Sequence, residues 1–215
     1  MVPESVVGSI SAPEFETFGS ALDLKFKTRT YFGIQGEILR ARADQTIGGF
    51  DYANLTAPAL PSSTQNLLDY QEQAGSFTIN QLLSDEWALG ARYRFCRSDY
   101  DSFFPKIPLT NINLHDKADL HEFNLSLFYN HPSGFFAQAE SKWFLQYNGG
   151  TSSTLGDESI NQVNLFCGYR FHRQRAKLTL GVMNLNDADY RLNPLNVYNE
   201  LPRERVFVAR LLVNF

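Results

Sequence analysis

The sequence predicts an all-β fold, an antiparallel meander of about nine or ten strands. Short segments along most of the chain alternate apolar and polar residues, as a strand does when one of its faces is covered. Tight polar turns and long connections rich in Gly, Pro or Asn follow one another between these segments. Aromatic residues are abundant, at 14% of 215 residues. These patterns predict one domain over residues 1–215, without a run of about 18 apolar residues that would form a membrane helix.

The first two strands are expected at 18–27 and 31–47, with a tight turn between them. In the first, Phe18, Leu22 and Leu24 share one face and charged residues share the other. The far half of the second strand is polar on both faces, so we expect it to extend beyond any apolar zone. The stretch 48–73 is rich in Gly, Pro, Ser, Thr and Asn, which predicts a loop.

Four further strands follow the same alternation, and the clearest runs from Trp87 to Arg97. Short polar stretches at 84–86 and 130–134 predict hairpin turns, whereas 98–119 predicts a second long loop. The expected strands are 75–83, 87–97, 120–129 and 135–147.

Three strands complete the predicted meander. One is centred on 163–171, and one begins at 176 and loses its alternation near Asn184. The last is 207–215, where every odd position is apolar and the other face carries Arg210 and Asn214. Long loops are expected at 148–159 and 187–204.

The strict alternation of short and long connections indicates an outer-membrane β-barrel, with short periplasmic turns and long external loops. Aromatic residues on the apolar face gather beside the short turns, where they would form a girdle at the membrane interface. We therefore expect the outer membrane of a Gram-negative bacterium, with outer-membrane lipid as the surrounding partner. The alternative is a soluble β domain that binds an apolar ligand. The aromatic residues beside the short turns are Phe26, Phe32, Trp87, Tyr129, Tyr169, Phe171 and Phe215, with Tyr147 at the opposite girdle.

The strand number predicts an incomplete barrel. Nine strands that end at the periplasm start outside the cell, whereas a complete bacterial barrel has an even strand number. Residues 1–16 also lack the basic start and apolar run of a signal peptide. We expect the C-terminal part of a larger barrel. The alternative is that 4–11 supplies a tenth strand and closes a small barrel with a structural or adhesive role.

Residues 178–215 resemble the C-terminus of TonB-dependent outer-membrane receptors. The matching elements are GVMNLND at 181–187, Asp189 with Tyr190, LPRER at 201–205, and a last strand that ends in Asn-Phe. The resemblance implies a barrel of roughly 22 strands that imports iron chelates, cobalamin or sugars. It also implies three partners, namely an N-terminal plug, an inner-membrane energy-coupling complex and the barrel assembly machinery, for which Phe215 is the expected signal. Neither a plug domain nor an energy-coupling box is recognisable in 1–215.

No motif indicates an enzyme or a cofactor site. Residues 115–121 hold two histidines and two aspartates, which we interpret as a solvated loop edge and not as a metal site. Cys96 and Cys167 lack metal-site spacing. The net charge of −4 argues against a nucleic-acid partner.

The polar face of the predicted strands would line the barrel lumen and is richer in bases than in acids. This balance suggests a lumen that favours anionic solutes or an acidic plug surface, and the alternative is that the bases pair with charges on further strands. Ligand contacts are expected in the four long loops. Our candidates for lumen-lining residues are Arg92, Arg94, Lys142, Arg170 and Arg210. The other predicted charges on this face are Lys25, Lys27, Lys177, Asp23, Glu37, Glu122 and Glu140.

Overall fold

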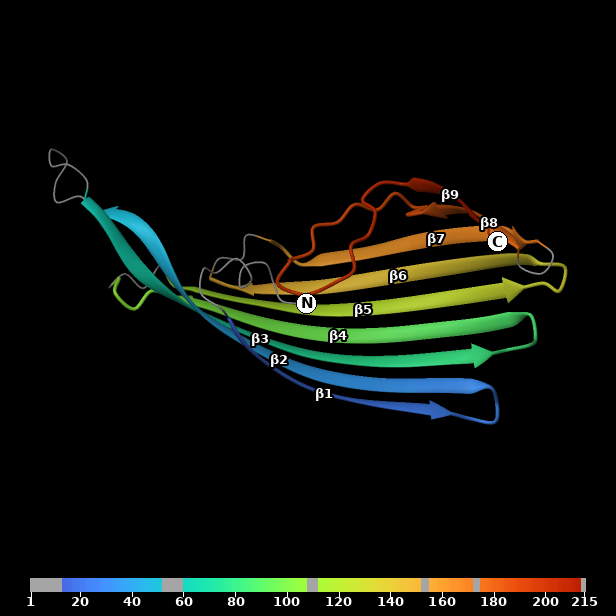
Figure 1. The fold of residues 1–215 in the computed structure, drawn as a ribbon, viewed down its shortest axis with the longest axis horizontal. Coiled ribbons are helices and arrows are strands. Elements are labelled where there is room, and N and C mark those ends of the chain that lie inside the picture. Colours follow the sequence, from blue (N-terminus) through green and yellow to red (C-terminus); the bar gives the residue numbers. More distant parts are fainter. Residues whose placement is uncertain (1–12, 52–59, 108–111, 152–154, 172–174, 214–215) are drawn as a thin grey trace.

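A computed structural model of the chain contains one antiparallel sheet of nine strands, each paired with its neighbours in chain order (Figure 1). The structure describes residues 13–51, 60–107, 112–151, 155–171 and 175–213. The predicted all-β meander is therefore confirmed. The strands are β1 (Glu14–Lys25), β2 (Thr30–Asp51), β3 (Leu60–Leu82), β4 (Trp87–Phe103), β5 (Leu114–Asn130), β6 (Phe135–Gly150), β7 (Glu158–Arg170), β8 (Ala176–Met183) and β9 (Val206–Val213).

The prediction of a loop over 48–73 is wrong for most of its length. β2 continues to Asp51, β3 begins at Leu60, and the two pair residue by residue out to this point. Beyond Arg42 neither β1 nor β4 accompanies them all the way, so β2 and β3 project as a two-stranded ribbon (Figure 1). Gly, Ser and Asn indicate loops only on average, because an antiparallel partner stabilises a strand whose two faces are both in water.

The predicted loop 98–119 is also largely strand, since β4 runs to Phe103 and β5 starts at Leu114. Opposite charges on facing residues hold this extension together. Arg97 forms two hydrogen bonds of 2.7 Å with Asp119, and Lys117 lies 3.3 Å from Asp99. The hydrogen bond from Arg97 is the main cause that lowers the pKa of Asp119. Cross-strand ion pairs thus replace the apolar alternation on which the prediction relied.

The two ends of the sheet differ in their connections, as predicted. Short connections at 26–29, 83–86, 131–134 and 171–175 lie at one end, on the right in Figure 1. The left end carries the longer ones, of which 151–157 is trimmed relative to the expected 148–159 because β6 and β7 extend into it. At 131–134 a positive φ of 102° at Gly134 closes the hairpin, which a residue with a side chain would strain.

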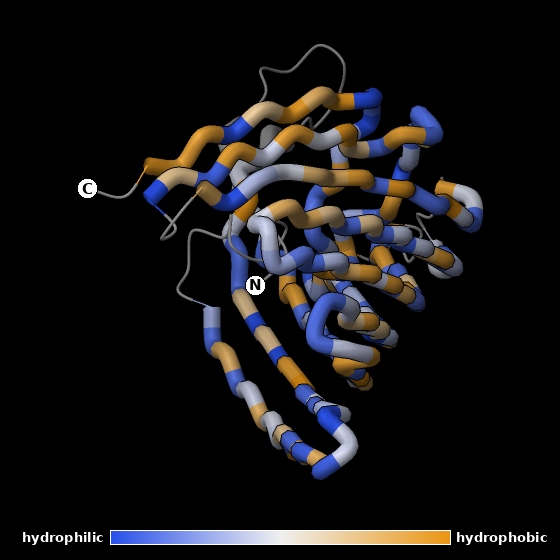
Figure 2. Tube along the Cα trace, turned by 90° about the vertical axis from the view of Figure 1, so that its right-hand side faces the viewer, coloured by the Kyte–Doolittle hydropathy of each residue, from blue (hydrophilic) through white to orange (hydrophobic). Residues whose placement is uncertain are grey.

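The sheet curls into an open trough (Figure 2), and the side chains on its two faces differ in character. The outer face is apolar and exposed on every strand, with aromatic residues beside the short turns. Trp87 lies 4.6 Å from Tyr129 between ring centroids, and Tyr169 lies 5.3 Å from Phe171. Buried residues instead lie on the inner face, which includes Cys96, Leu120 and Phe144. Phe215 is outside the described residues. In the described part of the chain, no helix is long and apolar enough to cross a membrane.

Candidate functional site

The segment between β8 and β9, residues 184–205, lies against the inner face of the sheet, and we call it the strap (Figure 1). The predicted loop over 187–204 is confirmed, since none of these residues belongs to a strand, but the loop folds back over the inner face of the sheet. Tyr190, Leu192 and Leu195 are at most 8% exposed, and Asn196 is 1% exposed. The strap therefore covers the trough instead of extending from its rim.

Two apolar clusters hold the strap against the sheet. In one, Leu195 packs among small and aromatic side chains of β2, β3 and β5 that include Ala41 and Tyr70. The other joins the strap residues Tyr190, Leu192 and Leu201 to the inner face of β4–β7. Its sheet members are Cys96, Leu120, Phe144 and Ile160. Without the strap, these four apolar side chains would be exposed on the inner face of the sheet. The strap removes them from water, which favours the folded state.

A signal for this packing exists in the sequence, although it was not used. Around Phe144 the run Trp143-Phe144-Leu145 is apolar on both faces, which a strand between lipid and water would avoid. Phe144 is 1% exposed, whereas Trp143 and Leu145 are 37% and 41% exposed. The departure from alternation thus marks the place where the inner face of β6 packs against the strap.

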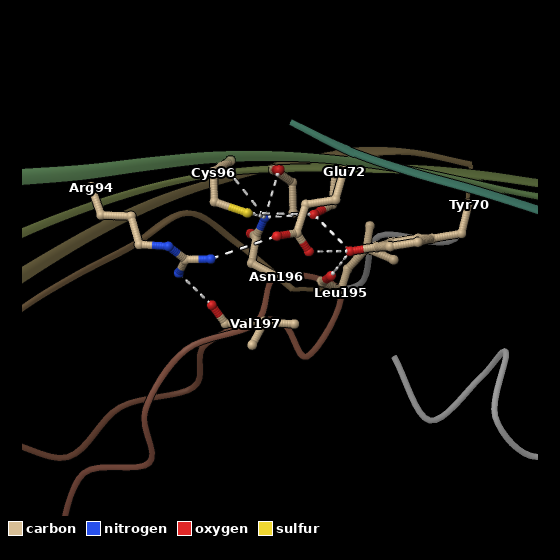
Figure 3. A network of polar contacts seen from close by, with 9 residues as sticks. Tyr70, Glu72, Arg94, Cys96, Leu195, Asn196 and Val197 are labelled. Atoms are coloured by element: carbon tan, nitrogen blue, oxygen red, sulfur yellow. Dashed lines mark hydrogen bonds and ion pairs between the residues drawn. The ribbon is translucent and has the colours of Figure 1, made fainter. Parts of the chain in front are cut away.

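Side chains of the sheet donate hydrogen bonds to backbone carbonyls along the whole strap. The Tyr70 hydroxyl donates to the Leu195 carbonyl at 3.1 Å, and the Arg94 guanidinium donates to the Val197 carbonyl at 2.6 Å (Figure 3). Gln162 on β7 donates to the carbonyls of Ala188 and Pro202, at 3.1 and 2.8 Å. These hydrogen bonds satisfy backbone carbonyls of the strap, which has no strand partner for them.

Asn196 also bonds the sheet through its side chain, and this amide is fully buried against β4 and β5 (Figure 3). Its two amide hydrogens are shared among three oxygens, at 3.0 Å from the Ser98 hydroxyl and the Ala118 carbonyl and at 3.3 Å from the Cys96 carbonyl. Its own oxygen accepts a 2.8 Å bond from Gln146. A buried amide with all its groups paired fixes the register of the strap on the sheet.

Glu72 is a buried acid beneath this part of the strap. The Tyr70 hydroxyl lies 2.7 Å from its carboxylate and shares its one hydrogen between that oxygen and the Leu195 carbonyl, and the Arg94 guanidinium lies 3.6 Å from Glu72 (Figure 3). Burial, followed by the charge of Glu72, raises the pKa of Tyr70, so this hydroxyl remains a donor at physiological pH. Glu72 escaped the sequence analysis because it fell within the predicted loop 48–73.

The motif Asn-Leu-Asn-Asp at 184–187 builds the base of the strap. Asn184 and Asp187 both have positive φ, at 52° and 55°, and turn the chain away from β8. The Asn184 amide donates to the carbonyls of Ala188 and Pro202, at 3.0 and 3.1 Å. At the other end Arg205 donates to Asp187 through its backbone amide, at 2.9 Å. The strap therefore leaves and rejoins the sheet at one clamped point.

The structure brings together two of the five candidate lumen residues, Arg92 and Arg94. Both lie on the inner face of β4, and both line a polar pocket of about 200 Å³ at the edge of the strap. Gln35, Glu37, Glu72 and Val197 also line it. Arg92 is exposed, whereas Arg94 is half-buried by its contacts with Glu72 and Val197.

The other three candidates lie on the same face but apart from this pocket. Lys142 on β6 stands between Asn124 and Gln162 in the strand register. The Arg170 guanidinium lies 4.5 Å from the centroid of the Phe136 ring, which a cation stacked on an aromatic face explains. Arg210 is exposed on β9, opposite Thr179.

His115, Asp119 and His121 form different contacts on the outer side of the sheet, whereas Asp116 lies on the inner face opposite Tyr100. His121 bonds the Tyr93 hydroxyl at 2.8 Å, His115 pairs with Asp101, and Asp119 pairs with Arg97. Within the described ranges, no group of three or more His, Cys, Asp or Glu residues could hold a metal ion.

Comparisons with models of protein families, with curated proteins and with solved structures give no match to this chain.

Proposed function

We propose that this chain is the C-terminal part of the barrel wall of a TonB-dependent receptor, in the outer membrane of a Gram-negative bacterium. In this role it takes part in the energy-coupled uptake of a nutrient ligand such as a siderophore. The exposed apolar outer face of the sheet is the observation that carries the proposal, because lipid matches such a surface and water does not.

The dimensions of this face support a place in a bilayer. On β4 the outer-facing positions are apolar from Trp87 to Phe95, and the next ones are Arg97 and Asp99. A barrel strand needs about 9–11 residues to cross the hydrocarbon core. Outward-facing residues that are at least 36% exposed include Phe18, Leu22, Ile34, Phe77, Trp87, Leu89, Tyr93, Phe123, Leu125, Leu127, Trp143, Leu145, Leu165, Tyr169, Leu178, Leu180, Phe207 and Leu211.

The residues that carry the family resemblance also have defined roles in the strap. Asn184 and Asp187 form its base, Arg205 clamps its return, and Tyr190 packs from the strap onto the inner face of the sheet. A motif that builds a buried, hydrogen-bonded element is more specific than a similar sequence in an exposed loop. The proposal therefore does not depend only on the alternation of strands with short and long connections.

In this proposal the inner face is directed to the lumen, where the plug and the passing ligand are the expected partners. The inner-membrane energy-coupling complex and the barrel assembly machinery are the further partners that the family implies. Four of the charges next to the strap edge, on Glu37, Glu72, Arg92 and Arg94, are balanced in sign. This local balance does not favour anionic ligands, so the ligand class remains to be found by experiment.

Disruption of the gene in its own host tests the proposed function. Growth is measured with ferric chelates, cobalamin or oligosaccharides as the limiting nutrient, with and without a protonophore. We expect the loss of energy-dependent growth on one of these ligand classes, restored by the intact gene and unchanged for the others. Unchanged growth on all three, together with recovery of the protein from the soluble fraction, would refute the proposal.

A further inference from the structure

We propose that the strap is a hinged internal lid, whose body at 188–202 leaves the inner face as one unit while the sheet stays folded. The functional consequence of this motion rests on the proposed function, because in a barrel the motion would widen the lumen. The observations that carry it are the clamped base of the strap, the nature of its contacts and the surface that it covers.

The base can act as a hinge because it holds the two ends of the body at one place. Asn184 bonds Ala188 and Pro202, the first and last residues of the body. Arg205 is held by Asp187 at 2.9 Å through its backbone amide, and by the Leu185 carbonyl at 3.0 Å through its guanidinium. These bonds join the two ends of the strap to each other and to the β8–β9 hairpin. Loops whose ends lie close together form compact units. The positive φ angles of Asn184 and Asp187 place the backbone change at one point.

The body of the strap is held by contacts that water can replace. Between 188 and 204 no residue belongs to a strand, so no backbone ladder with the sheet has to break. The sheet contributes single donors from Tyr70, Arg94 and Gln162 to carbonyls, and each such bond has only a modest net strength. The apolar clusters oppose opening, so the open state is a minor one.

Two contacts anchor the body at different strands of the sheet. They allow an experiment to distinguish opening of the whole body from local fraying. Asn196 is bonded by β4, β5 and Gln146 on β6, whereas Gln162 is on β7. The β4 end of the Asn196 anchor is three strands from β7, roughly 14 Å at the usual strand spacing. A unit that opens must lose both anchors together.

Opening would change the chemistry of the inner face at two places. It would expose the Cys96 thiol, which is now 0% exposed beneath Asn196, and the apolar ring of Phe144. It would also withdraw the Val197 carbonyl from Arg94, so that this guanidinium and Arg92 would both face the enlarged pocket.

Cys96 and Arg191 report on opening at two points of the strap. Cys167→Ser leaves Cys96 as the single thiol, and Cys167 is exposed on the outer face, away from the strap. Arg191 is an exposed trypsin site between the buried Tyr190 and Leu192, so cleavage there needs local undocking. Maleimide labelling and tryptic cleavage are followed by mass spectrometry on the full chain, in detergent micelles, while circular dichroism monitors the sheet.

We expect slow labelling and slow cleavage in the folded chain. Gln162→Ala should accelerate both by the same factor, roughly five-fold or more, because it removes two hydrogen bonds from the strap. Two matched variants should change neither rate. Asn199→Ala alters an exposed asparagine of the same strap, and Gln138→Ala alters an inner-face glutamine that pairs with Glu140.

The proposal is wrong if Cys96 reacts only when the sheet unfolds, or if Gln162→Ala leaves both rates unchanged. It is also wrong if the two reporters accelerate by different factors, since that result describes local fraying. Should the chain stay folded without detergent, the barrel proposal fails, and the same rates measured in buffer still decide whether the strap opens.

Discussion

Asn184 shows how one side chain can position a whole segment. It is fully buried, donates to the carbonyls of Ala188 and Pro202, and accepts a 2.8 Å bond from the Ala188 amide. Its φ of 52° is left-handed, a conformation that Asn tolerates better than most residues because its short amide can bond locally. Backbone conformation and hydrogen bonding thus select the same residue at the start of the strap.

These two contributions predict different costs for two substitutions of Asn184. Asn184→Gly loses the side-chain hydrogen bonds but accepts the positive φ, whereas Asn184→Ala loses the bonds and is strained by roughly 1–2 kcal/mol in addition. We expect the free energy of unfolding to fall in the order wild type, Gly, Ala, measured by denaturant titration in detergent. An alanine variant as stable as the glycine variant would show that backbone conformation is unimportant here.

At the scale of elements, the strap and β4–β7 depend on each other. The strap has no strand partner, and the inner face beneath it would carry exposed Leu120, Phe144 and Ile160 without it. Each element therefore stabilises the other by burying apolar side chains. Long-range packing of this kind links the C-terminal hairpin to the middle of the sheet.

The two faces of neighbouring strands should respond differently to the loss of a phenylalanine. Phe144→Ala opens a cavity under the strap and is expected to cost about 3–5 kcal/mol. Phe123→Ala, on the outer face of β5, should cost less, because Phe123 is 40% exposed in the structure. Denaturant titration of both variants in the same detergent measures the difference. Equal losses would mean that the strap does not pack on Phe144 as the structure shows.

At the scale of the whole molecule, the strap covers part of the inner face of the sheet, and the outer face carries exposed apolar side chains. The end strands, β1 and β9, each pair on one side only within the described sheet. Phe207 and Leu211 on β9 are 77% and 65% exposed. Under the proposed function, lipid covers the apolar face and further barrel strands pair with the two edges.

A pair of adjacent positions on β5 tests whether lipid covers the outer face. Leu125 faces outward and Ser126 faces inward, near the middle of the apolar zone. In lipid vesicles Leu125→Arg should destabilise the folded chain by about 2–4 kcal/mol, because the charge would enter the bilayer, and Ser126→Arg should cost much less. Unfolding titrations in vesicles and in buffer measure the contrast. If the chain folds in buffer and tolerates Leu125→Arg there, the outer face does not contact lipid.

The strands from the short turns to the end of the apolar zone were predictable because each keeps one face apolar. Their extensions, such as 98–103 on β4, were not, because charged residues there are stabilised by partners on the next strand, as Arg97 is by Asp119. The candidate site was predicted only in part. Arg92 and Arg94 lie together as inner-face residues, but nothing local indicated that Val197 would bond Arg94.

The amino-acid order alone determined the all-β class, the order of the strands and which face of each is apolar, since alternation is a property of neighbouring residues. Only the tertiary structure decided where 184–205 lies. That placement depends on donors from β3, β4 and β7 and on apolar side chains far away in the sequence. The Asn, Pro, Leu and Tyr residues of this segment have the composition of a surface loop. They become buried only because the sheet provides a complementary inner face.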